Sequence, residues 1–200
     1  MTLPLGKICE DIKEVNNINM KLVPKESQKV SEWTGGTTTE LLIFPENSTV
    51  SEQNFEYRIS TAKVLAEKSE FTLFPNHARK LAILEGKLKI QHNQSVWYFL
   101  ESGDQTAFSG DWKTKSEGQV VDFNVIYSDE YQVELDFVSQ IHCLPKMDEI
   151  ELFGVYCING MGRLNGIAFH EGDFVCVQEV DLKVESSENS RFIQVKITKL

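Results

Sequence analysis

Short alternations of apolar and polar residues, separated by turn residues, run through the sequence from residue 37 onward. The runs include TTTELLIF, FEYRISTAKVL, QVVDFNVIYS and RFIQVKIT. Successive side chains of a strand point to opposite faces, so this period of two predicts strands rather than helices. Regularly spaced short strands are typical of an all-β sandwich or barrel. Two segments, ICEDIKEVNNI (8–18) and PKMDEIELF (145–153), are the candidates for a helical turn.

One pattern occurs twice along the chain. RKLAILEGKLKI, followed by LESGDQTAF, recurs in outline as LFGVYCINGMGRL, followed by FHEGDFVCV. Each copy is interpreted as a strand, a Gly turn, a second strand, a Gly-Asp turn and a third strand. This repeat predicts two fused barrels, the first larger and more complete. Chance recurrence of Gly-Asp hairpins is the alternative. We place the barrels at 1–128, with an N-terminal extension that contributes strands, and at 129–200.

Charge and segment composition restrict the partners. Twenty basic and 30 acidic residues give a formal charge of -10, which disfavours nucleic acid and anionic membranes because phosphate groups require a basic face. The first residues lack a signal-peptide pattern, and no apolar run is long enough to cross a bilayer. We therefore expect a cytoplasmic protein with reduced cysteines. Cys157 and Cys176 lie in apolar runs and are expected in the core.

The glycine at position 86 allows a test for a metal site. Metal-binding cupin barrels carry His-x-His and then Glu before such a glycine. Counting back from Gly86 places Arg79 at the Glu position, and Thr72/Phe74 or Leu73/Pro75 at the His positions. The four histidines of the chain are not in ligand spacing. We therefore expect neither a metal nor another cofactor.

Two arginines are predicted to lie within strands. By alternation, Arg79 shares a face with Leu81 and Ile83, and Arg58 shares a face with Ser60. An arginine inside a barrel must pair with an acid or bind an anion, because a buried unpaired charge is costly. Pairing with a native acid such as Glu40, Asp122 or Glu85 and clamping of a ligand carboxylate both remain open, as does solvent exposure.

Further polar residues interrupt apolar strands. Glu40 lies among leucines, after the Gly35-Gly36 turn. Asp122 and Asn124 share one face of their strand, with Val121, Phe123 and Val125 on the other. This pattern fits a barrel with a polar interior, although a solvent-facing edge would give it too. No Ser-His-Asp or Cys-His arrangement indicates nucleophilic catalysis.

Four segments in order resemble the HutD/Ves family of small bacterial proteins: WTGGTTTE (33–40), FEYRISTA (55–62), FTLFPNHARKLAILEG (71–86) and DFNV (122–125). The loop between Trp33 and Glu40 is shorter than in many members. The resemblance implies a bicupin fold of two jelly-roll-like barrels without a catalytic metal. The ligand-facing positions that it implies are Glu40, Arg58, Ser60, Arg79, Asp122 and Asn124, with Trp33 and Phe74 as apolar walls.

The resemblance also implies a function. Some members are linked to bacterial histidine breakdown and have been suggested to bind a formylated or imidazole-bearing carboxylate. We therefore expect a small-molecule-binding protein for an anionic metabolite, with no catalytic residue. Alternatives are a metal-free isomerase or hydrolase, with a Glu or Asp base and an Arg that stabilises an oxyanion, and an interaction module with a packed interior. A homodimer through edge strands is compatible with the sequence.

Overall fold

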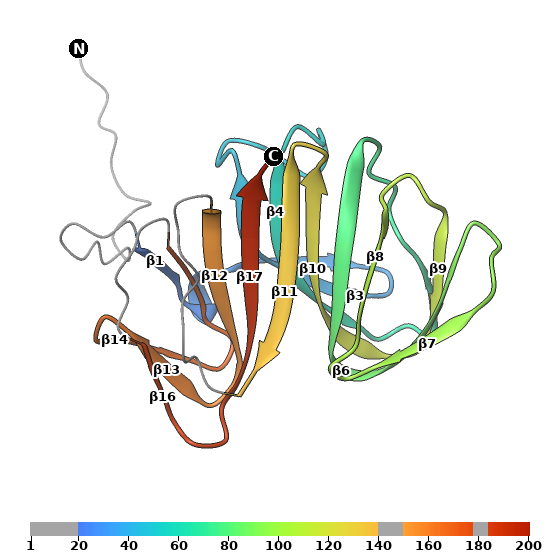
Figure 1. Cartoon of the computed structure of the whole chain (residues 1–200). Coiled ribbons are helices and arrows are strands. Elements are labelled where there is room, and N and C mark those ends of the chain that lie inside the picture. The colour runs from blue at the N-terminus through green and yellow to red at the C-terminus, as the bar shows by residue number, and fades with distance from the viewer. Residues whose placement is uncertain (1–19, 140–149, 178–183) are drawn as a thin grey trace, which may run out of the picture.

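The computed structural model of the chain describes residues 20–139, 150–177 and 184–200 (Figure 1). Within these ranges the chain is built from strands, and its one helix is a 3-10 turn, η1 (Lys25–Ser27). None of the described helical structure has the length and apolar character needed to cross a bilayer. The predicted helical turn at 8–18 lies outside the described residues. The second one is wrong for its described part, because residues 150–153 begin a strand.

The strands of the described residues form three sheets. The first has the order β2 (Lys29–Trp33), β3 (Gly36–Phe44), β4 (Tyr57–Val64), β10 (Val120–Ser128), β6 (His77–His92), β9 (Thr114–Glu117) and β5 (Lys68–Glu70), with β7 (Tyr98–Glu101) and β8 (Gln105–Ser109) also paired to β6. The second has the order β1 (Met20–Val23), β15 (Phe174–Val177), β12 (Ile150–Asn159), β17 (Arg191–Lys199) and β11 (Tyr131–Val138). The third comprises β14 (Ile167–His170), β13 (Met161–Leu164) and β16 (Val184–Ser186). We call strands β2–β10 the N-terminal barrel and β1 with β11–β17 the C-terminal barrel; they lie side by side in Figure 1.

One hydrophobic cluster lies between the two barrels and is formed by both of them. Apolar residues on one face of β4 and β10, including Ile59 and Phe123, join the same buried cluster as Val133, Ile193 and Val195 of the second sheet. Burial of such side chains contributes roughly 1.5–3 kcal/mol each relative to exposure. Because this cluster occupies one face of β4 and β10, the opposite face points into the N-terminal barrel.

Strand β6 differs from the prediction. The sequence suggests a strand, a Gly turn and a second strand, but β6 is continuous over His77–His92 and passes through Gly86. Gly86 has a φ of +89°, and a Cβ there would lie 2.5 Å from the Gln119 carbonyl oxygen. The glycine therefore bends the strand instead of reversing it. The N-terminal part of β6 pairs with β10, and its C-terminal part pairs with β7 and β9.

The predicted repeat has a counterpart in the hydrogen bonds of the two Gly-Asp turns. In the N-terminal barrel, the Gly103 amide donates to the Ile83 carbonyl, and the Ile83 amide donates to the Asp104 carbonyl, both at 2.9 Å. The same two bonds in the C-terminal barrel join Gly172 to Cys157 at 2.9 Å and Cys157 to Asp173 at 3.0 Å. Ile83 and Cys157 are therefore equivalent positions.

The bend after these positions is repeated as well. Three residues beyond Cys157, Gly160 has a φ of +87°, matching that of Gly86. In each barrel the residue directly after the equivalent position has no partner in the neighbouring strand. This residue is Leu84 in β6, opposite β10, and Ile158 in β12, opposite β17. A shared glycine bend and a shared β-bulge make chance recurrence of a hairpin an insufficient explanation.

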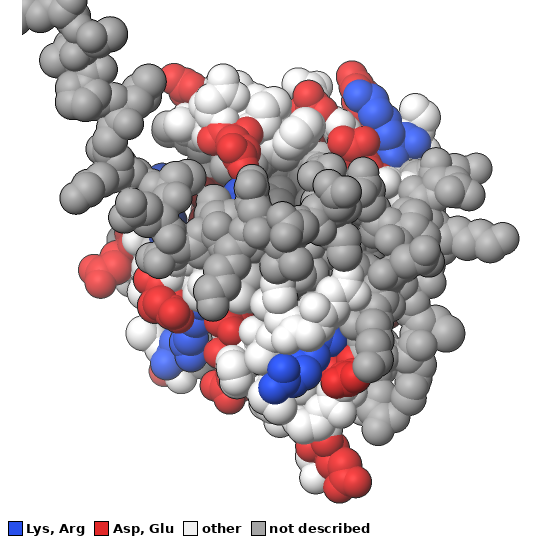
Figure 2. Space-filling view, turned by 90° about the vertical axis from the view of Figure 1, so that its left-hand side faces the viewer, with Lys and Arg blue, Asp and Glu red and all other residues white. Residues whose placement is uncertain are grey.

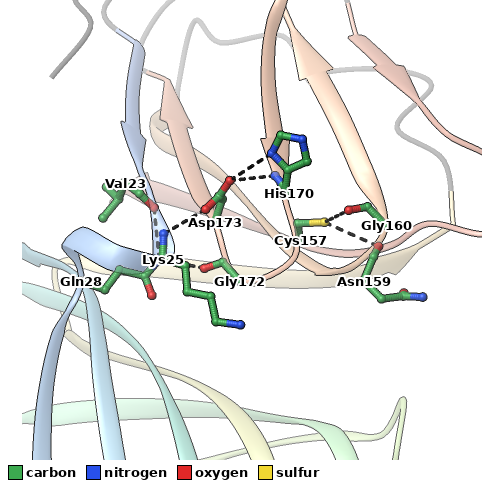
Figure 3. Close-up of polar contacts among 9 residues, drawn as sticks. All are labelled: Val23, Lys25, Gln28, Cys157, Asn159, Gly160, His170, Gly172 and Asp173. Carbon is green, nitrogen blue, oxygen red and sulfur yellow. Dashed lines mark hydrogen bonds and ion pairs between the residues drawn. The ribbon is translucent and has the colours of Figure 1, made fainter. Parts of the chain in front are cut away.

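The start of the described chain belongs to the C-terminal barrel. Strand β1 pairs antiparallel with β15, although the division at residue 128 assigns residues 20–23 to the first barrel. Figure 3 shows how the following segment is fixed: Asp173 Oδ1 accepts a hydrogen bond from the Lys25 amide (2.9 Å), and Gln28 Nε2 donates to the Gly172 carbonyl (2.8 Å). A local sequence pattern does not reveal pairing between strands about 150 residues apart, and residues 20–23 were therefore assigned to the first barrel. The division at residue 128 itself stays a prediction.

The predicted core cysteines are confirmed. Cys157 and Cys176 are buried and unpaired, one in the core of the C-terminal barrel and the other in the core between the barrels. Burial raises the pKa of each thiol to about 12, so both stay protonated at neutral pH. Cys9 and Cys143 lie outside the described residues.

Candidate functional site

Polar side chains gather on one face of the N-terminal barrel, where β3, β4, β10 and β6 lie next to one another. Residues directly opposite in an antiparallel ladder project to the same face. One row runs from Glu40 through Ser60 and Asn124. The next row contains Arg58 and Arg79 on either side of Ile126. Asp122 lies in a third row, and we call the face carrying these polar residues the inner face: Glu40, Arg58, Ser60, Arg79, Asp122 and Asn124.

Arg58 is paired with a native acid. Its Nε donates to Glu40 Oε2 at 2.8 Å, and its Nη1 donates to Ser60 Oγ at 3.4 Å. The Arg58 and Glu40 side chains are 10% and 18% exposed. Of the alternatives that the sequence leaves open, native pairing therefore describes Arg58. It also explains why a carboxylate stands at position 40, directly before the apolar residues Leu41, Leu42 and Ile43.

Arg79 lies in a different environment. Its guanidinium carbon is 4.8, 5.7 and 5.4 Å from the ring centres of Phe71, Phe74 and Phe108. Its Nη1 donates to the Thr72 carbonyl at 3.3 Å, whereas its buried Nε has no hydrogen-bond partner. Among the described residues, no ion pair reaches this guanidinium. Burial lowers the pKa of Arg79 to about 10, so it remains charged at neutral pH.

Asp122 and Asn124 present acceptors to the same face. Both residues are buried, and Asp122 Oδ1 and Asn124 Oδ1 have no hydrogen-bond partner. Burial raises the pKa of Asp122 to about 7, and the positive charge of Arg79 acts in the opposite direction. Leaving a buried polar atom without a partner costs about 1–3 kcal/mol. Among the six residues of the inner face, the buried polar atoms without a partner are therefore one donor, Arg79 Nε, and two acceptors, Asp122 Oδ1 and Asn124 Oδ1.

The two proposed wall residues are placed differently. Phe74 is buried, packs with Phe55 and Ile126, and contacts the Arg79 guanidinium. Trp33 lies at the end of the edge strand β2, against Gly35, and is 40% exposed. The burial expected of a wall residue is thus observed for Phe74 and not for Trp33.

A histidine network beside Arg79 was missed by the sequence analysis. His92 Nδ1 and Nε2 lie 2.8 Å from Thr114 Oγ1 and Tyr98 OH, and Tyr98 OH lies 2.9 Å from Thr106 Oγ1. The Thr114 hydroxyl donates to the Trp112 carbonyl (3.2 Å), so Nδ1 is the protonated nitrogen and Nε2 accepts from Tyr98. Burial and the charge of Arg79 lower the pKa of His92. The alternation Leu88, Ile90, His92 is the signal that could have revealed it.

The residues at this face do not fit a metal centre. Among the described residues, no three His, Cys, Asp or Glu side chains come together in an arrangement that could hold a metal ion. Arg79 stands at the position where a metal-binding cupin has its Glu ligand, and its positive charge opposes a divalent cation. His77, the nearest histidine in the chain, instead has its ring nitrogens on the Pro75 and Phe55 carbonyls.

The C-terminal barrel has apolar residues at the positions equivalent to Arg79 and Asp122. Arg79 lies four residues before Ile83, and Phe153 lies four residues before the equivalent Cys157. Asp122 pairs with Ile83 as Phe192 pairs with Cys157. Phe153 and Phe192 are both buried. Arg79 and Asp122 are therefore not required by the architecture, which forms an apolar core at the equivalent positions.

Similarity to solved structures identifies the fold. The chain is similar to the bacterial pirin YhhW from Escherichia coli in complex with nickel(II), at 9% identity over 90% of this chain and all of that one, with a TM-score of 0.64. It is also similar to oxalate decarboxylase from Bacillus subtilis, at 10% identity over 94% of this chain and 78% of that one, with a TM-score of 0.59. The fold is thus all-β and of the cupin type.

The family follows from a sequence comparison. The sequence model of the HutD family matches residues 25–193, and the chain belongs to this family. HutD from Pseudomonas fluorescens SBW25 and a conserved protein of unknown function from Pseudomonas aeruginosa PAO1 each have a TM-score of 0.75, at 21% and 18% identity over 90% of this chain and 99% of theirs. A comparison with the curated proteins finds no match.

Proposed function

We propose that this HutD-family chain is a small-molecule-binding protein that holds an anionic, carboxylate-bearing metabolite on the inner face of its N-terminal barrel. Arg79 is the anchor in this proposal. The observation that supports it is the buried Nε of Arg79, which has no hydrogen-bond partner. The fold does not require a charge at this position, because a buried phenylalanine occupies the equivalent position in the C-terminal barrel.

The free edge of Arg79 suits a carboxylate. Nη1 is used by the Thr72 carbonyl, which leaves the edge formed by Nε and Nη2. This edge of a guanidinium binds the two oxygens of a carboxylate side by side. The surrounding phenylalanine rings hold the guanidinium in place, so little conformational freedom is lost on binding.

The remaining polar atoms specify the rest of the ligand. Asp122 Oδ1 and Asn124 Oδ1 call for donors, such as the N–H of an amide or an imidazole. Arg58 contributes positive potential, but its Nε is engaged by Glu40. The sequence offers both Arg58 and Arg79 as residues that bind the ligand carboxylate, and we assign this role to Arg79. A role in amino-acid catabolism, and in histidine breakdown in particular, is part of the proposal through family membership alone.

Thermal shift with N-formylglycine, N-acetylglycine, imidazole-4-acetate and acetate tests the proposal. A ligand at about 100 times its Kd adds about 2.7 kcal/mol of stability, which raises the Tm by several degrees in a protein of this size. Arg79→Met should abolish the shift while filling the same volume. Arg163→Met, at an exposed arginine of β13, is the matched control and should keep it. The proposal fails if none of these carboxylates stabilises the wild type, or if Arg79→Met responds as the wild type does.

One observation favours a second candidate, a metal-free isomerase or hydrolase. Asp122 has an unpartnered oxygen and a pKa near neutrality, which suits a group that accepts and returns a proton. Glu40, the other candidate base, is held by Arg58. Proton NMR of each stabilising carboxylate, incubated with the wild type and with Asp122→Asn, tests this candidate. Conversion by the wild type alone would support it, and an unchanged spectrum would leave binding as the function.

A further inference from the structure

The charges of the inner-face residues restrict the net charge that a bound ligand can have. Glu40 neutralises Arg58 through a direct ion pair. Arg79 is the one remaining cation among the described residues of the inner face, and Asp122 is the one remaining carboxyl group. Arg79 and Asp122 form no ion pair, although each influences the charge of the other.

A carboxylate bound at Arg79 would place two carboxyl groups beside a single free guanidinium. Two carboxylates that share a buried site cannot both remain ionised at little cost, and one of them takes up a proton. Asp122 is the one with an unpartnered Oδ1 in a buried setting. Once protonated, Asp122 no longer repels the ligand carboxylate, and its unprotonated oxygen can still accept an N–H of the ligand.

We propose, on the basis of the proposed function, that Asp122 limits the site to ligands with one negative charge and takes up a proton when such a ligand binds at Arg79. A monoanion with this proton leaves the inner face neutral. A dianion would leave a net negative charge in a buried site, with no second free guanidinium to compensate it.

The groups that face Asp122 permit this coupling. β3 and β4 present Glu40 and Arg58, which neutralise each other, and β4 also presents Ser60. β6 presents Arg79 and, at its far end, the neutral imidazole of His92. β8 and β9, which pair with β6, contribute hydroxyl groups at Thr106, Thr114 and Ser116. The burial that raises the pKa of Asp122 to about 7 makes protonation accessible at neutral pH.

Calorimetric titration of N-acetylglycine at pH 7.5, in HEPES and in Tris, measures the proton. The difference between the binding heats in these two buffers should correspond to uptake of about half to one proton per bound molecule. The Kd should rise by up to about tenfold per pH unit above neutrality. Asp122→Asn should give equal binding heats in both buffers, meaning no proton uptake, and a Kd that does not change with pH.

A matched pair of probes measures the charge limit. N-acetylasparagine and N-acetylaspartate have nearly the same shape and differ by one negative charge. The dianion should bind about tenfold or more weakly to the wild type, and Asp122→Asn should reduce that ratio. Arg79→Met serves as the control for the site itself.

The outcomes separate the two proposals. If N-acetylglycine binds through Arg79 with no proton uptake, or N-acetylaspartate binds as well as N-acetylasparagine, the inference about Asp122 is wrong and the binding function stands. If none of these probes binds, or if Arg79→Met binds them unchanged, the binding function is wrong and the inference fails with it.

Discussion

Arg79 and Phe153 occupy equivalent positions in the two barrels, four residues before a strand position with the same turn hydrogen bonds and the same bulge after it. One position carries a buried cation with an unpartnered Nε, and the other carries a phenylalanine packed into a core. Because the fold accepts an apolar side chain here, the charge in the N-terminal barrel is retained at the expense of stability.

The first prediction concerns this cost. The double variant Arg79→Met/Asp122→Asn should be more stable than the wild type by about 1–4 kcal/mol, because it removes two buried charges whose desolvation no direct ion pair compensates. Urea unfolding at pH 7 without carboxylates measures it. Arg163→Met, at an exposed arginine, should stay within about 0.5 kcal/mol. A double variant less stable than the wild type would show that Arg79 and Asp122 are structural.

The second prediction concerns the Arg58–Glu40 pair. Glu40→Gln leaves a mostly buried guanidinium without its counter-charge. The variant should lose about 2–4 kcal/mol, somewhat less than a fully buried pair because Glu40 retains contact with water. Glu101→Gln breaks the exposed pair with Lys87, whose side chains are 64% and 80% exposed, and should lose about 0.5 kcal/mol or less. Equal losses in the two variants would contradict a structural role for the Arg58–Glu40 pair.

The alternation of polar and apolar residues carries most of what the sequence predicts correctly. It places Arg58, Ser60, Asp122 and Asn124 on one face of their strands, because side-chain direction follows directly from the period of two. The repeat between the two barrels was also recognisable from local sequence, because Gly86 and Gly160 lie at the same distance after Ile83 and Cys157 and mark the same bend. These features depend on a few neighbouring residues.

Features that depend on contacts distant in sequence were not predictable in the same way. The sequence leaves both Glu40 and Asp122 open as partners for Arg58. The pairing of β3 with β4 places Glu40 opposite Ser60, two residues from Arg58 in β4, where the ion pair forms. The His92 network joins residues from four strands. Gly86 gives the same local signal whether it bends a strand or closes a hairpin, and the pairing of β6 with β10 and β9 determines the outcome.

The third prediction concerns the pH dependence due to Asp122. Its pKa is raised from 3.8 to about 7 in the folded state, so between these values the folded chain holds a proton that the unfolded chain releases. The contribution of Asp122 to stability therefore falls as pH rises from about 4 to 7 and is constant above that range. Urea unfolding of the wild type and Asp122→Asn from pH 4 to 8 isolates the effect. The stability gain of Asp122→Asn over the wild type should increase across this range, and a constant difference would contradict the raised pKa.

The fourth prediction concerns His92 and has the opposite sign. Its pKa is lowered by burial and by Arg79, so below its ordinary value of about 6.5 the unfolded chain binds a proton that the folded chain does not. This contribution is present above that value and is lost as pH falls. The hydrogen bond from Tyr98 to Nε2 favours the neutral ring. Tyr98→Phe should therefore raise the midpoint of the His92 NMR titration, whereas Tyr127→Phe should leave it unchanged. A lower midpoint in Tyr98→Phe would mean that Nε2 donates rather than accepts.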